Sequence, residues 1–369
     1  FRMLGRAWFV ASQVGQIKST DEHRDLWVRI SKGVIMAIPV MVIFLVLFSQ
    51  ADLAFSRFLQ NIIDVDITER TVQRSVLMLL AFLASLGYLA YVFFPKAKSI
   101  TDEPASHTSD MIVSAKSGGK GIEVLVFLSL IGALFLLFIG FQVAYLFGGQ
   151  TNIINAGFTY AEYARRGFWE LLGVALFSLV ILLASEKYAG AERAVKKDKR
   201  FLIPACILIA MVAIIIVSAF KRLALYVDAY GMTDLRFYVA AIIILLIGLF
   251  VVLTIKFLLS KPEQFFAFGT VITLAIVLIM INIVNPDAYI VKANLAKYRQ
   301  IGKIDIDNIS GLSADAVPGK LELFQELQGG DKETLWQALS VQKDYLESAG
   351  NRWQSGNLAR DRALELLRK

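Results

Sequence analysis

The segments GFTYAEYARRGFWELL (Gly157–Leu172) and FKRLALYVDAYGMTDLRFY (Phe220–Tyr238) frame the part of the sequence that decides the fold. Each mixes aromatic residues with charges, and two long apolar runs lie between their polar parts. A run of about 20 apolar residues can cross the hydrocarbon core of a bilayer as a helix. We therefore interpret the two segments as connections at a membrane surface, held in place by membrane spans and followed by a polar tail.

The composition of the whole chain supports a membrane protein. Of its 369 residues, 57% are hydrophobic and only 19% are charged, whereas soluble domains are about half apolar and a quarter charged. The net charge of +7 is spread over connecting segments, without an arginine-rich block. This pattern indicates a topology signal and contact with anionic lipids, and it argues against nucleic acid as a partner.

Few side chains are available for a cofactor or a metal centre. The single cysteine, Cys206, lies inside an apolar run, and the two histidines, His23 and His107, lie in different polar segments. We therefore expect no disulfide framework, no thiolate or histidine metal site and no cofactor.

Seven apolar runs qualify as spans, so the predicted fold is an all-α polytopic transmembrane helix bundle. The runs are Val34–Phe48, Val76–Phe94, Val124–Phe147, Phe168–Ala184, Phe201–Phe220, Phe237–Leu259 and Phe265–Val284. Pro39 predicts a kink in the first span. We expect residues 1–32 to be an N-terminal cytoplasmic or interfacial segment, 33–285 the transmembrane domain and 286–369 a helical tail.

The orientation of the bundle follows from Lys and Arg in the short connections. The segment before the first span and every second connection after it are richer in these residues than the alternate connections. Because cytoplasmic loops carry the excess of positive charge, the N-terminal segment is predicted in the cytoplasm and the tail on the extracytoplasmic side.

The second outer connection, Gly148–Gly167, leads to a group of polar and aromatic residues at the start of a span. Tyr160, Tyr163 and Glu170 share one helical face, and Glu162–Arg166 and Arg166–Glu170 are i,i+4 pairs. Two interpretations stay open: a polar site at the membrane boundary, and an aromatic belt whose salt bridges anchor a helix end.

The third outer connection, Lys221–Arg236, repeats this pattern. Its candidate site residues are Arg222, Tyr226, Tyr230, Thr233 and Arg236. Gly231 is expected to end one helix and Thr233 to cap the next. Arg222 would serve as a partner for Glu170 or as a ligand for an acidic group, but we expect its side chain to extend to water.

The first outer loop, Ser49–Arg74, holds three acidic residues, Asp64, Asp66 and Glu69. An Asp-x-Asp pair can bind a divalent metal through carboxylate oxygens, as a transferase acting on a lipid-linked substrate would require. The alternative, which we favour, is an ordinary solvated amphipathic connection.

The tail begins with Asn285-Pro286-Asp287, the signature of a capped helix start. Apolar spacing predicts helices over Ala288–Tyr298, Ala314–Leu327, Lys332–Leu346 and Leu358–Leu367. The tail is thus expected to be a small helical module that covers the outer face or binds a partner.

Five motifs resemble a bacterial multi-pass membrane family known only as a domain of unknown function, DUF4173. They are YAEYARRGFWELL, RLALYVDAYGMTDLRFY, NPDAYIVKANL, GLSADAVP and WQSGNLARDRALELL. The resemblance covers about Gly132 to the C-terminus. The resemblance implies a protein of the bacterial inner membrane and brings no activity or cofactor. By matching positions it adds Asp287 and Asp315 to the candidate site on the outer face.

Three functions stay open. The favoured one is a non-catalytic scaffold, sensor or accessory subunit that binds an envelope protein through its outer loops and tail. The second is a transporter or lipid-handling protein with a polar site at the outer membrane boundary. The sequence shows no charged residue in the middle of a predicted span, which argues against this function. The third is a metal-dependent transferase that uses Asp64, Asp66 and Glu69.

Overall fold

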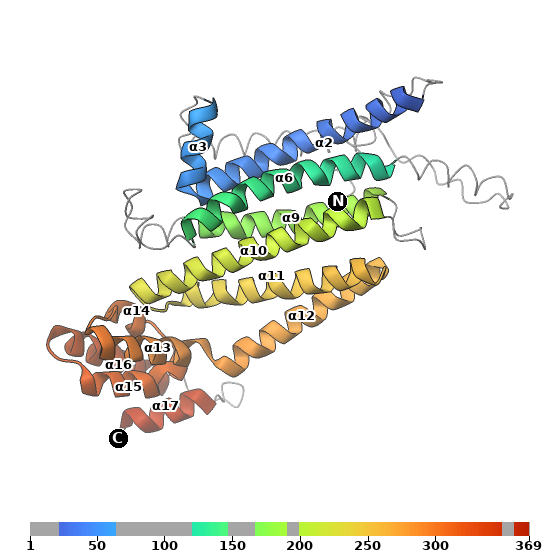
Figure 1. The fold of residues 1–369 in the computed structure, drawn as a ribbon. Coiled ribbons are helices and arrows are strands. Elements are labelled where there is room, and N and C mark those ends of the chain that lie inside the picture. The colour runs from blue at the N-terminus through green and yellow to red at the C-terminus, as the bar shows by residue number, and fades with distance from the viewer. Residues whose placement is uncertain (1–21, 64–119, 147–166, 190–198, 349–357, 369) are drawn as a thin grey trace, which may run out of the picture. The chain divides into compact units, whose positions relative to one another are not determined.

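In a computed structural model, residues 22–63, 120–146, 167–189, 199–348 and 358–368 are described, and all their regular elements are helices (Figure 1). Six helices in this part of the chain are long and apolar enough to cross a membrane. They are α2 (Glu22–Ala51), α6 (Lys120–Leu146), α9 (Phe168–Ala189), α10 (Lys199–Tyr230), α11 (Asp234–Leu258) and α12 (Glu263–Val284). The protein is therefore an all-α polytopic membrane bundle, as predicted.

Each of the six helices coincides with one of the predicted spans, apart from Leu259, which follows α11. Phe147 and the remaining predicted span, Val76–Phe94, lie outside the described residues. The fifth predicted span, Phe201–Phe220, lies within α10, which continues to Tyr230. No glycine or proline occurs between Phe220 and Tyr230, so the helix runs on until Gly231. Pro39 lies inside α2, which continues past it as one helix.

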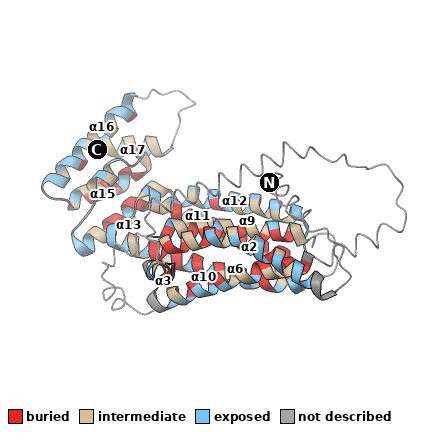
Figure 2. Cartoon of the chain, turned by 90° about the horizontal axis from the view of Figure 1, so that it is seen from above, coloured by how far each residue is buried: buried red, intermediate tan, exposed pale blue. Residues whose placement is uncertain are grey.

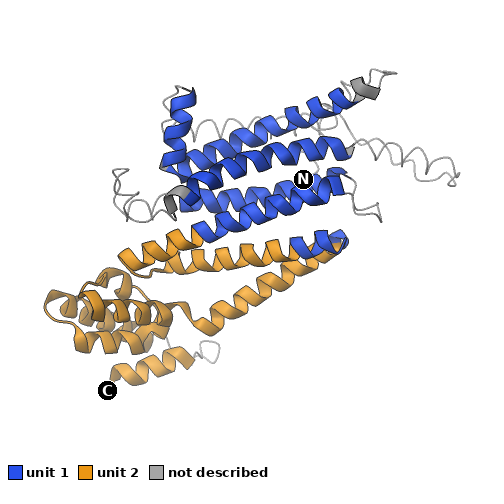
Figure 3. Ribbon diagram, viewed as in Figure 1, with its two compact units in different colours: residues 1–158, 166–218, 253–263 blue, residues 159–165, 219–252, 264–369 orange. Residues whose placement is uncertain are grey.

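The chain forms two compact units (Figure 3). Unit 1 comprises residues 1–158, 166–218 and 253–263, and unit 2 comprises residues 159–165, 219–252 and 264–369. Helix α10 is divided between the two units, and the boundary falls after Ser218. The division of the chain at residues 32 and 285 stays a prediction.

In unit 1, α2, α6 and α9 pack against one another. Gly33 of α2 lies against Glu123 of α6, and Phe48 further along α2 stacks on Phe138 further along α6, so these two helices run in the same direction. Gly167, just before α9, lies against Ala51 at the end of α2, so α9 runs in the opposite direction.

A cluster of phenylalanine rings joins α2 and α6 to α3 (Leu53–Ile63), a helix that the sequence analysis treated as part of a loop. Asp52 begins α3, since its carboxylate accepts hydrogen bonds from the backbone N–H groups of Ala54 and Phe55. The rings in contact are those of Phe44, Phe48, Phe55, Phe58, Phe135, Phe138 and Phe141. Stacked and edge-to-face pairs of this kind fix the register of the helices. Figure 2 colours the buried residues of these helices red.

The C-terminal part of unit 2 folds into a helical module, called the C-terminal module below. Its elements are α13 (Pro286–Ile301), α14 (Ile306–Ser310), η1 (Ala314–Ala316), α15 (Val317–Glu326), α16 (Gly330–Ser348) and α17 (Leu358–Arg368). The four helices predicted here are found, except that the second is divided into η1 and α15 and that α14 precedes it. The buried core is formed by Ile290, Val291, Leu295, Ile309, Leu312, Ala316, Leu323, Leu327, Leu335 and Leu339.

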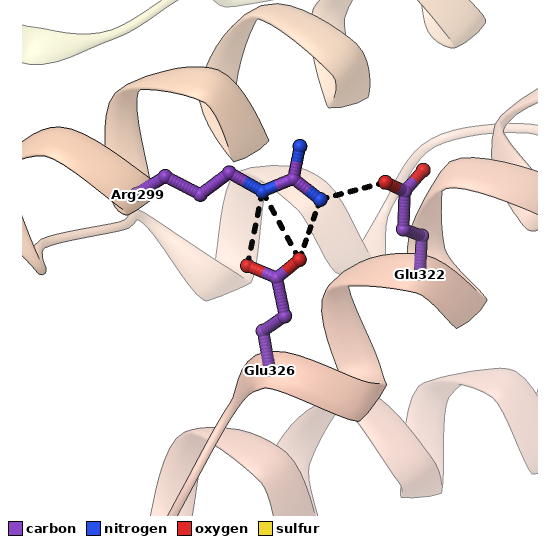
Figure 4. A network of polar contacts seen from close by, with 3 residues as sticks. All are labelled: Arg299, Glu322 and Glu326. Atoms are coloured by element: carbon purple, nitrogen blue, oxygen red, sulfur yellow. Dashed lines mark hydrogen bonds and ion pairs between the residues drawn. The ribbon is translucent and has the colours of Figure 1, made fainter.

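One exposed ion-pair network lies on the surface of the C-terminal module. Arg299 of α13 donates to the carboxylates of Glu322 and Glu326 of α15 (Figure 4). Hydrogen bonds with these two carboxylates raise the pKa of Arg299 above its ordinary value, and the bond from Arg299 lowers the pKa of Glu326. Since all three groups are in contact with solvent, we expect this network to contribute little to stability.

Candidate functional site

The predicted site residues fall into three groups in the structure. Those outside the described residues are Tyr160, Glu162, Tyr163, Arg166, Asp64, Asp66 and Glu69. Glu170 lies in unit 1, in the first turn of α9. The others, Arg222, Tyr226, Tyr230, Thr233, Arg236, Asp287 and Asp315, all lie in unit 2.

Arg222 is buried, with 1% of its surface exposed, inside the apolar helix α10. This corrects the expectation that its side chain extends to water. A charged side chain inside a membrane span is costly to insert and usually marks a functional or structural site.

The connection between α10 and α11 is set by Gly231. Its φ of 83° is the left-handed conformation that ends a helix, and its N–H donates to the carbonyl of Val227 at 2.8 Å. Thr233 precedes the first residue of α11, Asp234, as predicted. The stop signal and the start signal are therefore both local, and both were readable in the sequence.

Arg236 of α11 reaches back over this connection to the end of α10. Its guanidinium carbon lies 4.1 Å from the ring centroid of Tyr226 and 5.9 Å from that of Tyr230. It also donates a hydrogen bond to the carbonyl of Gly231. The two tyrosine rings are themselves in edge contact, with centroids 5.1 Å apart. Three predicted site residues thus form one cation–π group that braces the turn.

Asn294 of α13 holds the turn from the other side. Its Oδ1 accepts a hydrogen bond from the N–H of Met232 at 2.9 Å, and its Nδ2 donates to the carbonyl of Met232 at 2.7 Å. A Cβ at Gly231 would lie 2.5 Å from Asn294 Oδ1, so close approach as well as positive φ requires glycine here. One amide side chain thereby satisfies both backbone groups of Met232.

Lys297, one turn further along α13, caps the end of α10. Its Nζ donates to the carbonyls of Asp228 at 2.7 Å and of Val227 at 3.3 Å. A cation at the C-terminal carbonyls is favoured by the helix dipole. Burial lowers the pKa of Lys297, Asp228 opposes that shift, and Arg236 adds to it. We call Val227, Asp228, Met232, Asn294 and Lys297 the Met232 clamp.

Asp287 organises the start of the C-terminal module. Its carboxylate accepts a hydrogen bond from the N–H of Ser313 at 2.9 Å, and Asn285 caps α13 with its side chain. The matched motif position Asp315 is half-buried in η1. Asp287 therefore ties the NPD motif to the GLSADAVP motif, although the two lie far apart in the sequence.

Lys320, which follows the GLSADAVP motif by two residues, is fully buried. Its ammonium donates to the carbonyls of Ser310 at 3.0 Å and Leu312 at 2.7 Å and to Gln342 Oε1 at 3.0 Å. Burial lowers its pKa to about 8, and the negative charge of Asp287 opposes this shift. All three ammonium protons are thus used to hold α14, α15 and α16 together.

A second polar group, called the charge cluster, lies in unit 1 and was missed by the sequence analysis. Its residues are Glu123, Glu186, Lys187, Tyr188, Lys256 and Glu263. The side chains of Lys256 and Glu186 are 1% and 10% exposed and pair at 2.5 Å. Tyr188 donates a hydrogen bond to Glu123, and Lys187 faces Glu263 at 3.6 Å on the surface.

The charge cluster brings together the start of α6, the end of α9, the end of α11 and the start of α12. The sequence analysis did not single out Lys256. The signal that could have found this group is a charged residue inside the last turns of a predicted apolar helix. In the same way, Asn294 interrupts the apolar row Ile290, Val291 and Leu295 of α13, which marks it as a buried polar side chain.

The contacts of the Met232 clamp and of Lys320 hold helices together. In the Met232 clamp and around Lys320, most contacts join a side chain to backbone carbonyls and N–H groups. Within the described residues, no group of three or more His, Cys, Asp or Glu side chains could hold a metal ion.

Comparison with known proteins gives a family without an activity. A family model described as Domain of unknown function (DUF4153) matches residues 1–323. No curated protein and no solved structure matches the chain. The family number differs from the 4173 suggested by the motifs, and the match begins at residue 1 instead of near Gly132. The expectation of a membrane family of unknown function is confirmed: the chain belongs to the DUF4153 family.

Proposed function

We propose that this protein is a non-catalytic scaffold or accessory subunit of a bacterial envelope complex, which binds a protein partner through its C-terminal module. The observation that carries the proposal is the Met232 clamp. Arg236 braces the turn between α10 and α11 through its contacts with two tyrosine rings. Asn294 and Lys297 fix α13 to this turn and to the end of α10. A rigid module held at the end of membrane helices is suited to presenting a binding surface.

The surface of α16 supports the same proposal. Val341 and Tyr345 lie one turn apart on this helix and are 70% and 69% exposed. Exposed aromatic and aliphatic side chains in neighbouring positions are typical anchors of protein interfaces. The occupant we propose is a protein of the envelope, since this helix belongs to a module made of mixed polar and apolar surface.

The proposed orientation places the C-terminal module outside the cytoplasm. Exposed Lys187, Lys199, Arg200 and Lys261 gather on helix ends of unit 1 that would then face the cytoplasm. Anionic lipid headgroups are their proposed partners, each basic side chain adding about 1 kcal/mol near such a surface.

The test is native mass spectrometry of the full chain purified in mild detergent from its own host. We expect a protein partner in a fixed ratio with the wild-type chain. Val341→Asp combined with Tyr345→Asp should lower the bound fraction at least about tenfold, because both anchors would become charged. The matched control is Gln337→Ala with Asp344→Ala, two exposed polar positions on the same helix. A chain that is always solitary, or a partner retained equally by both double variants, contradicts the proposal.

A second candidate, a transporter or lipid-handling protein, is favoured by one observation. Arg222 and the Lys256–Glu186 pair are buried charges inside membrane helices, where the sequence alone had shown none. In the same mass spectra, a lipid retained by the wild-type chain and lost in Arg222→Gln would support this candidate. Spectra free of lipid in both chains would remove it.

A further inference from the structure

Helix α12 differs from the other membrane helices in how little of it is buried. Only 6% of its apolar window is buried, whereas the windows of the other five helices are 33% to 50% buried. Its contacts with α11 are close, since a Cβ at Gly248 would overlap Thr273 and one at Gly269 would overlap Val252. One side of α12 is therefore packed, and the remaining sides face outward.

The face of α12 opposite α11 carries a regular row. Its residues are Phe268, Val271, Ala275, Leu278 and Asn282. The spacing of three, four, three and four residues is that of the seam of a two-helix coiled coil. At about 100° per residue, the row lies roughly half a turn from Thr273 and Gly269. Phe268, Val271 and Leu278 are 67%, 65% and 50% exposed, and Ala275 and Asn282 are exposed as well.

Asn282 gives this row a polar end. Its Nδ2 donates to the carbonyl of Leu278 of its own helix at 2.9 Å. The amide oxygen and the other N–H have no partner in the described part of the chain. Asn282 lies two residues before the end of α12 at Val284. Amide side chains on the exposed face of a membrane helix promote association of such helices.

We infer that α12 pairs with α12 of a second copy of this chain, through a two-fold axis along the membrane normal. Two copies inserted in the same direction place their α12 helices parallel, so each row residue meets its own counterpart. Asn282 then lies beside the partner's Asn282, at equal depth. The amide is self-complementary, because it offers both a donor and an acceptor. Ala275, in the middle of the row, lets the two backbones approach closely.

The choice of a second copy rests on this self-complementarity. An unrelated helix would have to supply a polar group at the same depth, whereas a second α12 does so by symmetry. The inference is independent of the C-terminal module and of the partner proposed for it.

Disulfide crosslinking of the full chain in liposomes of phosphatidylethanolamine and phosphatidylglycerol tests the pairing. The background is Cys206→Ser, which removes the only cysteine of the sequence. Ala275→Cys lies on the row, and Ile276→Cys is a matched control that is also exposed but lies off the row. With an oxidant, Ala275→Cys should give at least about fivefold more covalent dimer than Ile276→Cys, since only the first lies at the seam.

A second measurement separates specific pairing from collision. The starting chain keeps Asn282. When Asn282→Leu is introduced, the association constant of the dimer should fall about 5- to 30-fold. It should fall much less with Asn282→Gln, which keeps the amide. Because Asn282 is exposed, neither variant removes a core contact. Equal crosslinking at positions 275 and 276, a dimer unchanged in Asn282→Leu, or adducts with another protein in place of the homodimer would overturn the inference.

Discussion

Buried charges are handled differently in the charge cluster of unit 1 and in the C-terminal module of unit 2. In the charge cluster, Lys256 is paired with the side chain of Glu186. In the C-terminal module, Lys320 and Lys297 donate mainly to backbone carbonyls. The first arrangement joins two charges of opposite sign, and the second places a cation among neutral dipoles.

The difference has consequences for mutation. A pair of charged side chains can be removed as a whole, and its replacement by apolar residues is often neutral. The carbonyl partners of a lysine cannot be removed by mutation, because the backbone stays; of the partners described for Lys320, only the side chain of Gln342 can be removed. Variants of the two regions should therefore respond differently to a second substitution and to pH.

The largest effect is expected for Lys256→Met. The variant leaves the carboxylate of Glu186 buried without its cation, which costs about 3–5 kcal/mol of unfolding free energy. The double variant Lys256→Met with Glu186→Met should regain most of this loss. Denaturant titration in mild detergent measures both, with the exposed Lys261→Met as control. If the double variant is as unstable as the single one, the two side chains do not act as a pair.

The next effect is a pH dependence that originates from Lys320. Its pKa is about 8 in the folded chain and 10.5 is the ordinary value, so the unfolded chain binds more protons between these pH values. The unfolding free energy should thus rise as the pH increases from about 8 to 10.5, by up to about 3 kcal/mol. Below pH 8 the full penalty of the buried charge is present.

The control for this pH dependence is Lys320→Met, which has no titratable group at this position. The difference in melting temperature between wild type and variant should change over that pH window. For the exposed Lys292→Met no such change is expected. Parallel pH profiles of wild type and Lys320→Met would show that the buried ammonium is not the source.

A smaller and more local effect is expected for Asn294→Ala. The variant removes two hydrogen bonds and leaves the N–H of Met232 without its partner, at a cost of about 2 kcal/mol, while the carbonyl of Met232 keeps Asn308 as a donor. Hydrogen exchange should accelerate at Met232 and along α13, while exchange in unit 1 stays unchanged. Lys292→Ala, an exposed neighbour on α13, serves as control. Unchanged protection at Met232 would argue against the Met232 clamp as the joint between α13 and the turn.

The smallest effect is expected for Arg299→Gln. Its ion pairs with Glu322 and Glu326 are solvent-exposed, so water and salt screen them. The melting temperature should shift by no more than the scatter between replicates, and any shift should vanish in high salt. A large loss that persists in high salt would mean that this network contributes as much as the buried groups.

The sequence predicted those parts of the structure that depend on neighbouring residues. Gly231 ends α10, Asn285-Pro286 starts α13, and the apolar runs become helices, because each signal lies within the element that it governs. The same reasoning selected Tyr226, Tyr230 and Arg236, which do meet, since a short turn keeps them close. It missed α3, whose capping residue Asp52 was placed in a solvated loop.

What the sequence could not supply were the pairs formed across long separations. Asn294 meets Met232 sixty-two residues away, and Lys256 meets Glu186 seventy residues away. Asn294, Lys256 and Glu186 were visible as polar residues within or beside apolar stretches, but the neighbouring residues do not indicate which group each one contacts.

The sequence alone identified a helical membrane protein and several of its helix ends, such as those at Gly231 and Asn285. It did so because the thickness of the bilayer and the rules of helix termination act on short segments. Only the tertiary structure decided which charges are buried and what each contacts. The physical reason is that burial is a property of packed helices, and packing sums many contacts between segments far apart in the chain.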